Sequence, residues 1–128
     1  MPAKTPEETH ALLAAAFNSG DIDAFVDVYE EDAVLVAPPQ GETVSGRDQI
    51  RRALESTFAI HPKAEIRVVG KLQRDGLALT VAHWTLSGSD ADGAGVEMEG
   101  RGTIVSRRQP GGTWRIALDL PVRPDLEG

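Results

Sequence analysis

One acidic residue is a candidate for chemistry because its neighbours in the sequence are apolar. Asp119 lies between Leu118 and Leu120 in the segment RIALDLPV, which has the composition of a strand. Strict alternation places Asp119 on one face with Arg115, and places Leu118 with Trp114 on the other face, the better core candidate. Two interpretations stay open. Asp119 either pairs with Arg115 at the surface, or strand curvature turns it into an apolar pocket, where a raised pKa suits proton transfer near neutral pH.

Two adjacent aromatic residues in an earlier strand are the next candidates. His83 and Trp84 must face opposite sides of that strand, so one of them should reach a pocket. We expect Trp84 to pack against apolar neighbours, whereas His83 is either a satisfied, partly buried histidine or a base. Tyr29 is predicted on the apolar side of the second helix. Its hydroxyl either donates a hydrogen bond within the pocket or lies at the rim of the core.

Motifs for phosphate, metal and serine chemistry are absent from the chain. It has no G-x-G-x-x-G or G-x-x-x-x-G-K loop, no HExxH and no G-x-S-x-G. The three histidines are far apart in the sequence: His10, His61 and His83. We therefore predict neither a metal site nor a cofactor.

The composition predicts a single cytoplasmic domain. The chain has 128 residues, no cysteine and a formal net charge of −7, which suggests one domain and excludes disulfides and thiolate chemistry. The acidic balance argues against nucleic acid as a partner, because phosphates repel a surface without a basic patch. The N-terminal segment MPAKTPEETH lacks the apolar region of a signal peptide, and no stretch is long enough to span a bilayer. We therefore expect no membrane partner.

Three helices are predicted in the first half of the chain. The first begins at Thr5, in a Thr-x-x-Glu capping box, and ends at Gly20. The second begins at Asp21 and ends near residues 30–32. After it we expect a strand at 33–37, a break at 38–41 and a third helix at about 46–61. Each helix carries one phenylalanine on its apolar side, and together these are predicted to form a pocket wall: Phe17, Phe25 and Phe58.

The second half of the chain is predicted to consist of strands and turns. Four strands are expected, at 64–72, 77–87, 96–108 and 113–121. Helices first and antiparallel strands later indicate an α+β fold, in which a curved antiparallel sheet packs against three helices. We expect one domain over residues 1–128, with a core at 6–121 and a loose tail at 122–128.

Both faces of the strand at 77–87 are apolar. Leu77, Leu79 and Val81 share one face, and Ala82, Trp84 and Leu86 share the other. One face should meet the pocket, which leaves the other too apolar for water. We therefore predict that a two-fold partner covers it in a homodimer.

The segment FNSGDIDAFVDVYEEDAVLVAPPQGETVSGRDQIRRAL resembles the SnoaL-like and DUF4440-like members of the nuclear transport factor 2-like (ketosteroid isomerase-like) superfamily. The residues that carry the resemblance are Asn18, Gly20, Asp21, Asp23, Tyr29, Asp32, Ala33, Gly46 and Ile50. HWTLSG and GGTWRIALDLPVRP are similar to later strands of the family. One departure is that Leu118-Asp119-Leu120 stands where many DUF4440-like members have His-Asp-His.

The resemblance implies a cystatin-like fold, a conical sheet around one apolar pocket that takes a small hydrophobic molecule. It also implies that Asp119 is the acid–base of a cofactor-independent isomerase, cyclase, dehydratase or hydrolase, with Tyr29 and His83 orienting the ligand. The implied ligand-binding residues are Phe17, Phe25, Phe58 and Trp84. A non-catalytic dimeric module that binds a ligand or a protein stays open as the alternative.

Overall fold

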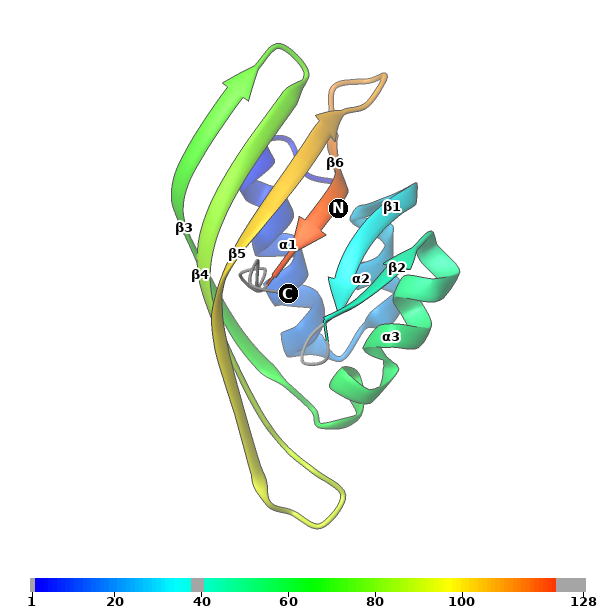
Figure 1. The fold of residues 1–128 in the computed structure, drawn as a ribbon, viewed down its shortest axis with the longest axis vertical. Helices are drawn as coiled ribbons and strands as arrows, with labels where there is room; N and C mark the ends of the chain where they lie inside the picture. The colour runs from blue at the N-terminus through cyan, green and yellow to red at the C-terminus, as the bar shows by residue number, and fades with distance from the viewer. Residues whose placement is uncertain (1, 38–40, 122–128) are drawn as a thin grey trace.

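Three helices pack against a six-stranded curved, unclosed sheet in the computed structural model (Figure 1). The structure describes residues 2–37 and 41–121. The helices are α1 (Pro6–Ser19), α2 (Ile22–Asp27) and α3 (Arg47–Ala59). The strands are β1 (Tyr29–Ala37), β2 (Glu42–Ser45), β3 (Lys63–Arg74), β4 (Leu77–Ser89), β5 (Gly95–Arg108) and β6 (Trp114–Leu120). This arrangement confirms the predicted α+β fold, and each of the last four strands ends within two residues of its predicted limits.

The sheet is mixed, which corrects the expectation of a purely antiparallel one. Its strand order is β2-β1-β6-β5-β4-β3, and β1 and β6 run parallel while every other pair is antiparallel. The chain leaves β1 through β2 and α3 to build the far edge, then returns strand by strand until β6 meets β1 (Figure 1). The parallel pair therefore lies where the last strand of the antiparallel meander joins the first strand of the chain.

The first helix is delimited by the residues that predicted its ends. The Thr5 hydroxyl accepts a hydrogen bond from the Glu8 amide at 3.2 Å, and Gly20 takes the left-handed conformation at φ 70°. Asp21 then caps α2 by accepting from the Ala24 amide at 3.0 Å. Asn18 fixes this corner to the sheet, because its amide group exchanges two hydrogen bonds with the Ala64 backbone, at 3.1 and 2.7 Å.

The second helix is shorter than predicted, and Tyr29 belongs to β1. α2 ends at Asp27, and Tyr29 already pairs with Ile116 of β6. The Tyr29 carbonyl accepts two hydrogen bonds from the Arg47 guanidinium, at 3.0 and 2.7 Å. Strand pairing with β6 and the hydrogen bonds from Arg47 stabilise an extended conformation at Tyr29, although the helical spacing of apolar residues continues through it. The strand therefore begins four residues before its predicted start.

β2 was not predicted. It is a four-residue edge strand that pairs antiparallel with β1, between Val34↔Ser45 and Ala37↔Glu42. Part of the predicted break, residues 38–40, lies outside the described residues. Only Val44 of β2 is buried, so the strand has too little apolar alternation to be detected in the sequence.

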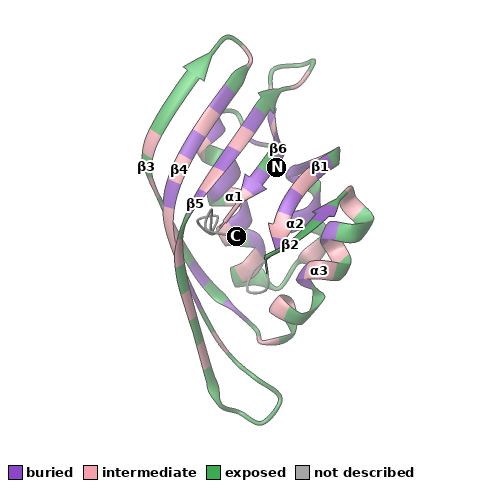
Figure 2. Cartoon of the chain, viewed as in Figure 1, coloured by how far each residue is buried: buried purple, intermediate pink, exposed green. Residues whose placement is uncertain are grey.

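The main core lies between the helices and the sheet face that they cover. Buried and partly buried positions alternate along much of β4 and in the second half of β5, as Figure 2 shows. α1 packs against β3, β4, β5 and β6, whereas α3 packs against β1 and β2. The largest side chains at the centre of this core are Tyr29, Ile50 and Ile116, each fully buried. We call the covered face of the sheet the inner face and the opposite one the outer face.

Candidate functional site

An apolar cavity lies between the helices and the inner face. Its apolar lining includes Leu13, Leu35, Leu54, Ile66, Leu86, Met98 and Ile104, contributed by α1, α3 and four strands. Its free volume is about 80 Å³, several times the roughly 10–15 Å³ that one water molecule needs by the same measure. None of the lining residues is a lysine or an arginine. The cavity is therefore shaped for an uncharged or cationic group and not for an anion.

Asp119 and Tyr29 meet in this cavity. The Tyr29 hydroxyl donates a hydrogen bond to Asp119 Oδ2 at 2.5 Å, and Asp119 is 7% exposed. Burial raises the pKa of Asp119 to about 6, although the hydrogen bond from Tyr29 opposes this shift. Burial and the neighbouring acid raise the pKa of Tyr29 well above its usual value, so the hydroxyl keeps its proton. The pair is thus a carboxyl group that can titrate near neutral pH and a donor that holds it in place.

A β-bulge explains why Asp119 faces inward, against the strict alternation expected from the sequence. On β5, Ser106 pairs with Ile116 and Val105 with Leu118, so Ala117 is the extra residue of β6. The bulge brings Asp119 to the same face as Ile116 and sends Leu118 outward, where it is 49% exposed. The prediction that Leu118 lies on the core face was wrong for this reason.

Arg115 does not pair with Asp119. Its guanidinium lies 3.8 Å from Asp27 at the surface, and both side chains are partly exposed. Because the bulge separates Arg115 from Asp119, the structure contradicts the surface-pair interpretation of Asp119.

Trp84, and not His83, lines the cavity. The Trp84 indole nitrogen donates a hydrogen bond to the Pro121 carbonyl at 2.6 Å. Its ring packs so closely on Gly100 that a Cβ at that position would lie 2.8 Å from Cζ2. We call the contact between Trp84 and Pro121 the latch, because it joins the end of β6 to β4 across one rim of the cavity.

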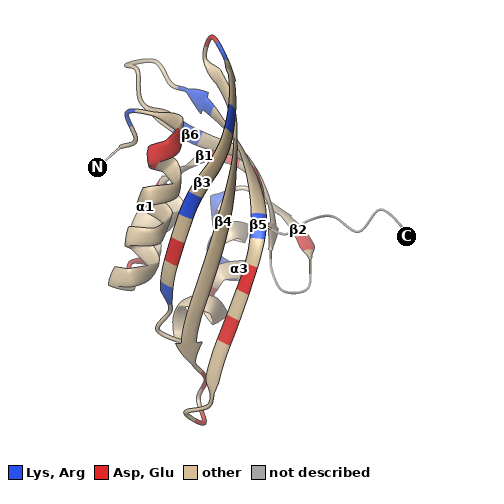
Figure 3. Ribbon diagram, turned by 90° about the vertical axis from the view of Figure 1, so that its left-hand side faces the viewer, with Lys and Arg blue, Asp and Glu red and all other residues tan. Residues whose placement is uncertain are grey.

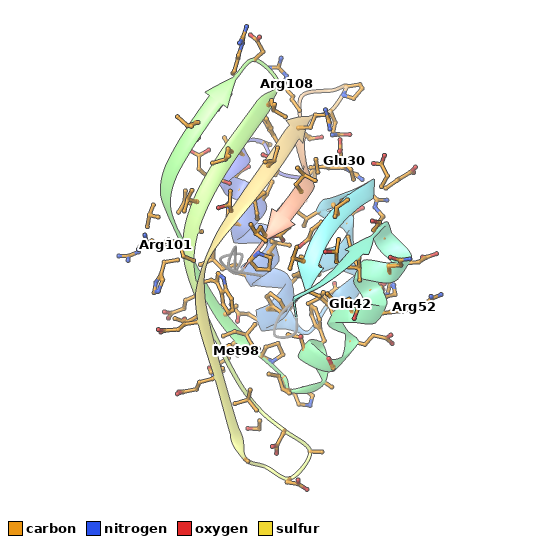
Figure 4. The ribbon with its side chains drawn as sticks, viewed as in Figure 1. Glu30, Glu42, Arg52, Met98, Arg101 and Arg108 are labelled. Carbon is orange, nitrogen blue, oxygen red and sulfur yellow. The ribbon has the colours of Figure 1, made fainter. Side chains whose placement is uncertain are left out.

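His83 lies on the outer face between two arginines. It pairs with Arg67 on β3 and Arg101 on β5. Figure 4 shows Arg101 projecting away from the helices. The structure therefore does not bring His83 to Asp119 and Tyr29, and its expected role in orienting a ligand there has no geometric support.

The three predicted phenylalanines form one aromatic cluster with Tyr29. The centroid of the Phe17 ring lies 4.8 Å from that of Phe25 and 5.1 Å from that of Phe58. Phe25 also contacts Tyr29, with ring centroids 5.5 Å apart. Phe17 and Phe25 line the cavity, whereas Phe58 packs behind them. The cluster fixes the tyrosine whose hydroxyl holds Asp119.

A second buried polar pair was missed in the sequence. His10, on α1, lines the cavity and is 3% exposed, and its Nε2 lies 2.6 Å from the hydroxyl oxygen of Thr80 on β4. Burial lowers the pKa of His10 to about 4, so the ring is uncharged at neutral pH. The signal was present, because His10, Leu13 and Phe17 follow the i, i+3, i+7 spacing of one helical face.

No metal centre or membrane-spanning helix is found in the part of the chain that the structure describes. Within residues 2–37 and 41–121, no group of three or more histidine or acidic side chains is placed to hold a metal ion. No helix in the same ranges is long and apolar enough to cross a bilayer.

A family model matches most of the chain, and solved structures share its fold. The SnoaL-like domain family matches residues 10–116. A ketosteroid isomerase-like protein from Erwinia carotovora atroseptica superposes with a TM-score of 0.77 at 20% identity, covering 88% of each chain. A nuclear transport factor 2-like superfamily protein from Salmonella enterica has a TM-score of 0.73 at 16% identity, covering 94% of this chain and 92% of that one.

A third structure is a nuclear transport factor 2-like protein of unknown function from Shewanella oneidensis. Its TM-score is 0.72 at 18% identity, covering 88% of this chain and 92% of that one. No curated protein sequence matches the chain.

Proposed function

The chain belongs to the SnoaL-like domain family, and on this premise we propose that its cavity binds a small apolar molecule and that Asp119 exchanges a proton with it. The observation that carries the proposal is the buried hydrogen bond of 2.5 Å from the Tyr29 hydroxyl to Asp119 Oδ2. Among the described residues, Asp119 Oδ1 has no hydrogen-bond partner, which leaves one carboxyl oxygen for a ligand.

The chemistry that fits this pair is proton transfer at a carbon next to a carbonyl group. The carboxylate of Asp119 takes the proton, and the electron pair of the C–H bond moves into an enolate whose oxygen carries the charge. The protonated acid then returns the proton, to the same carbon or to another one, which gives exchange or isomerisation. A pKa of about 6 leaves the carboxylate mostly ionised at pH 7 and still basic enough to accept a proton.

Tyr29 acts in this proposal as a positioning residue. Its hydroxyl keeps its proton and stabilises the carboxylate, which otherwise would be costly to bury without a cation nearby. Among the described residues, no lysine or arginine lines the cavity, so we expect the ligand not to be an anion, and we propose a neutral ketone. Isomerisation, aldol-type cyclisation and dehydration of a neutral ketone all need such a base and no cofactor.

A non-catalytic dimeric binding module is the second candidate. It is favoured by the exposed apolar side chains of the outer face, among them Val69 at 51%, Leu77 at 47% and Leu118 at 49% exposure. We propose that a second copy of the chain covers this face, and that residues 6–121 act as one domain in the dimer.

The first test uses 2-tetralone, a neutral bicyclic ketone with exchangeable hydrogens beside its carbonyl. In deuterated buffer at pH 7, we expect the protein to accelerate deuterium incorporation, measured by proton NMR. Asp119→Asn should reduce the protein-dependent rate by about 10²-fold or more, within the range that positioned acids and bases contribute. Tyr29→Phe should reduce it less, because the carboxylate stays in place.

Arg115→Gln is the matched control, because Arg115 lies on the same strand but pairs with Asp27. It should leave the exchange rate unchanged. If wild type binds 2-tetralone but does not accelerate exchange, the catalytic proposal is wrong and the binding module stands.

A further inference from the structure

The buried pair of His10 and Thr80 has no role in the chemistry proposed above, although His10 lines the same cavity. Thr80 is fully buried, and its hydroxyl lies 2.6 Å from His10 Nε2 and 3.4 Å from the Ile104 carbonyl. Among the described residues, the Nδ1 atom of His10 has no hydrogen-bond partner. Burying a polar ring without a full set of partners is unfavourable, so a ligand group that bonded this nitrogen would offset that cost.

The register of the sheet fixes the position of this pair relative to Asp119. Thr80 of β4 pairs with Ile104 of β5, and Ile104 pairs with Asp119 of β6. The three residues therefore form one row across three adjacent strands of the inner face. Adjacent strands are about 4.8 Å apart, so the two polar ends of the row are separated by roughly 10 Å.

The middle of the row is apolar. Ile104 stands between the two polar residues and is 3% exposed. His10 extends from α1 over the Thr80 end, while Tyr29 holds the Asp119 end. The cavity lining thus places its titratable side chains at two separated points, with Thr57 and Thr85 as the other hydroxyl-bearing residues besides Tyr29.

We infer that His10 is a specificity-determining residue that hydrogen-bonds a second polar group of the ligand, at the opposite end from the group that meets Asp119. The ligand class is then an uncharged, mainly apolar molecule with one oxygen- or nitrogen-containing group at each of its two ends. This inference rests on the proposed function, because it concerns the same cavity. Since the imidazole of His10 is uncharged at neutral pH, it selects for a hydrogen-bonding group and not for an anion.

The test compares two probes that differ by one hydroxyl group. 2-Tetralone carries only its carbonyl, and 6-hydroxy-2-tetralone adds a hydroxyl at the far end of the ring system. In calorimetric titrations of wild type at pH 7, we expect 6-hydroxy-2-tetralone to bind about tenfold more tightly, the gain that one good hydrogen bond supplies. His10→Phe should reduce this preference to about onefold, whatever its effect on the affinity for 2-tetralone itself.

Two further variants separate recognition from packing. His10→Gln keeps a hydrogen-bonding group and should retain part of the preference, which a merely structural role would not predict. His83→Phe removes a histidine from the outer face and should retain all of it.

The outcomes distinguish the inference from the proposed function. Equal affinity of wild type for the two ketones overturns the role of His10 and leaves proton exchange at Asp119 intact. A preference that survives in His10→Phe also overturns it. Absence of binding of both ketones overturns the proposed function, and the inference with it.

Discussion

The inner and outer faces of this sheet differ in how they treat polar groups, although the same strands build both. On the inner face of β6, Ile116 is fully buried and the carboxyl of Asp119 is held by Tyr29. On the outer face of the same strand, Leu118 is 49% exposed. The inner face therefore buries few polar groups: Asp119 and Thr80 have hydrogen-bond partners, while the buried Ser106 hydroxyl has none among the described residues. The outer face leaves apolar groups in contact with water.

The charges of the outer face are arranged in rows. Arg67, His83 and Arg101 form one row across β3, β4 and β5, and Glu65 and Glu99 flank Thr85 in the next row. Figure 3 shows these charges along β3 and β5, with β4 uncharged between them. The difference between the faces teaches that proton transfer is expected on the inner one, where desolvation can shift a pKa, and association on the outer one.

The largest effect is expected from a charge placed on the outer face. We predict a homodimer of the 13.7 kDa chain, and Leu118→Arg should dissociate it. The change removes apolar contact and brings like charges together across a two-fold axis, which should raise the Kd at least about a hundredfold, close to 3 kcal/mol. Light scattering at micromolar concentration measures the mass.

Ser56→Arg is the control, because it adds the same charge on the exposed side of α3, and it should leave the mass unchanged. A monomeric wild type would refute the role given to the outer face.

The inner face predicts a compensated pH dependence of stability. Asp119 has a folded pKa of about 6 against an ordinary 3.8, so the folded state holds a proton that the unfolded state loses as the pH rises from 4 to 6. Stability falls across that window. His10 has a folded pKa of about 4 against 6.5, so stability falls in the opposite direction, as the pH drops from 6.5 to 4. Each contribution is on the order of 3 kcal/mol, and in wild type the two largely cancel.

Single substitutions should expose each contribution. In Asp119→Asn, the free energy of unfolding should decrease as the pH is lowered from 6.5 to 4, because only the His10 contribution remains. In His10→Gln, the free energy of unfolding should increase over the same downward interval, because only the Asp119 contribution remains. Urea unfolding at the two pH values measures both changes, and parallel pH profiles for wild type and both variants would contradict the assigned burial of the two groups.

The contrast between the faces also explains what the sequence could predict. Caps at Thr5, Gly20 and Asp21 are local, so the helix ends that depend on them were predicted correctly. The side to which Asp119 points depends on the bulge at Ala117, which is set by pairing with β5 and leaves no local signal.

The choice between His83 and Trp84 is of the same kind. Alternation guarantees that they face opposite sides but cannot tell which side is covered by helices. His10 differs, since its spacing with Leu13 and Phe17 was a local signal of its burial on α1 that our predictions did not use. Its partner Thr80 is 70 residues away, and no local pattern predicts that contact.

The smallest expected effect compares neighbours on opposite faces. Trp84→Phe keeps an aromatic ring in the cavity but removes the donor to the Pro121 carbonyl, the latch that joins β6 to β4. Loss of one such hydrogen bond should lower the free energy of unfolding by about 1 kcal/mol. His83→Phe, one residue earlier, removes a ring nitrogen that faces outward and should change stability by less than about 0.5 kcal/mol.

The latch also bears on the cavity, because Pro121 and Trp84 both line it. Gly102 permits their contact, since a Cβ there would lie 2.9 Å from the Pro121 Cα. Releasing Pro121 widens that rim, so Trp84→Phe should speed the dissociation of 2-tetralone, measured by NMR line shape, while His83→Phe should not. If the two variants match in both stability and dissociation rate, the latch contributes nothing beyond packing. The asymmetry between the faces would then rest on the Asp119–Tyr29 and His10–Thr80 pairs alone.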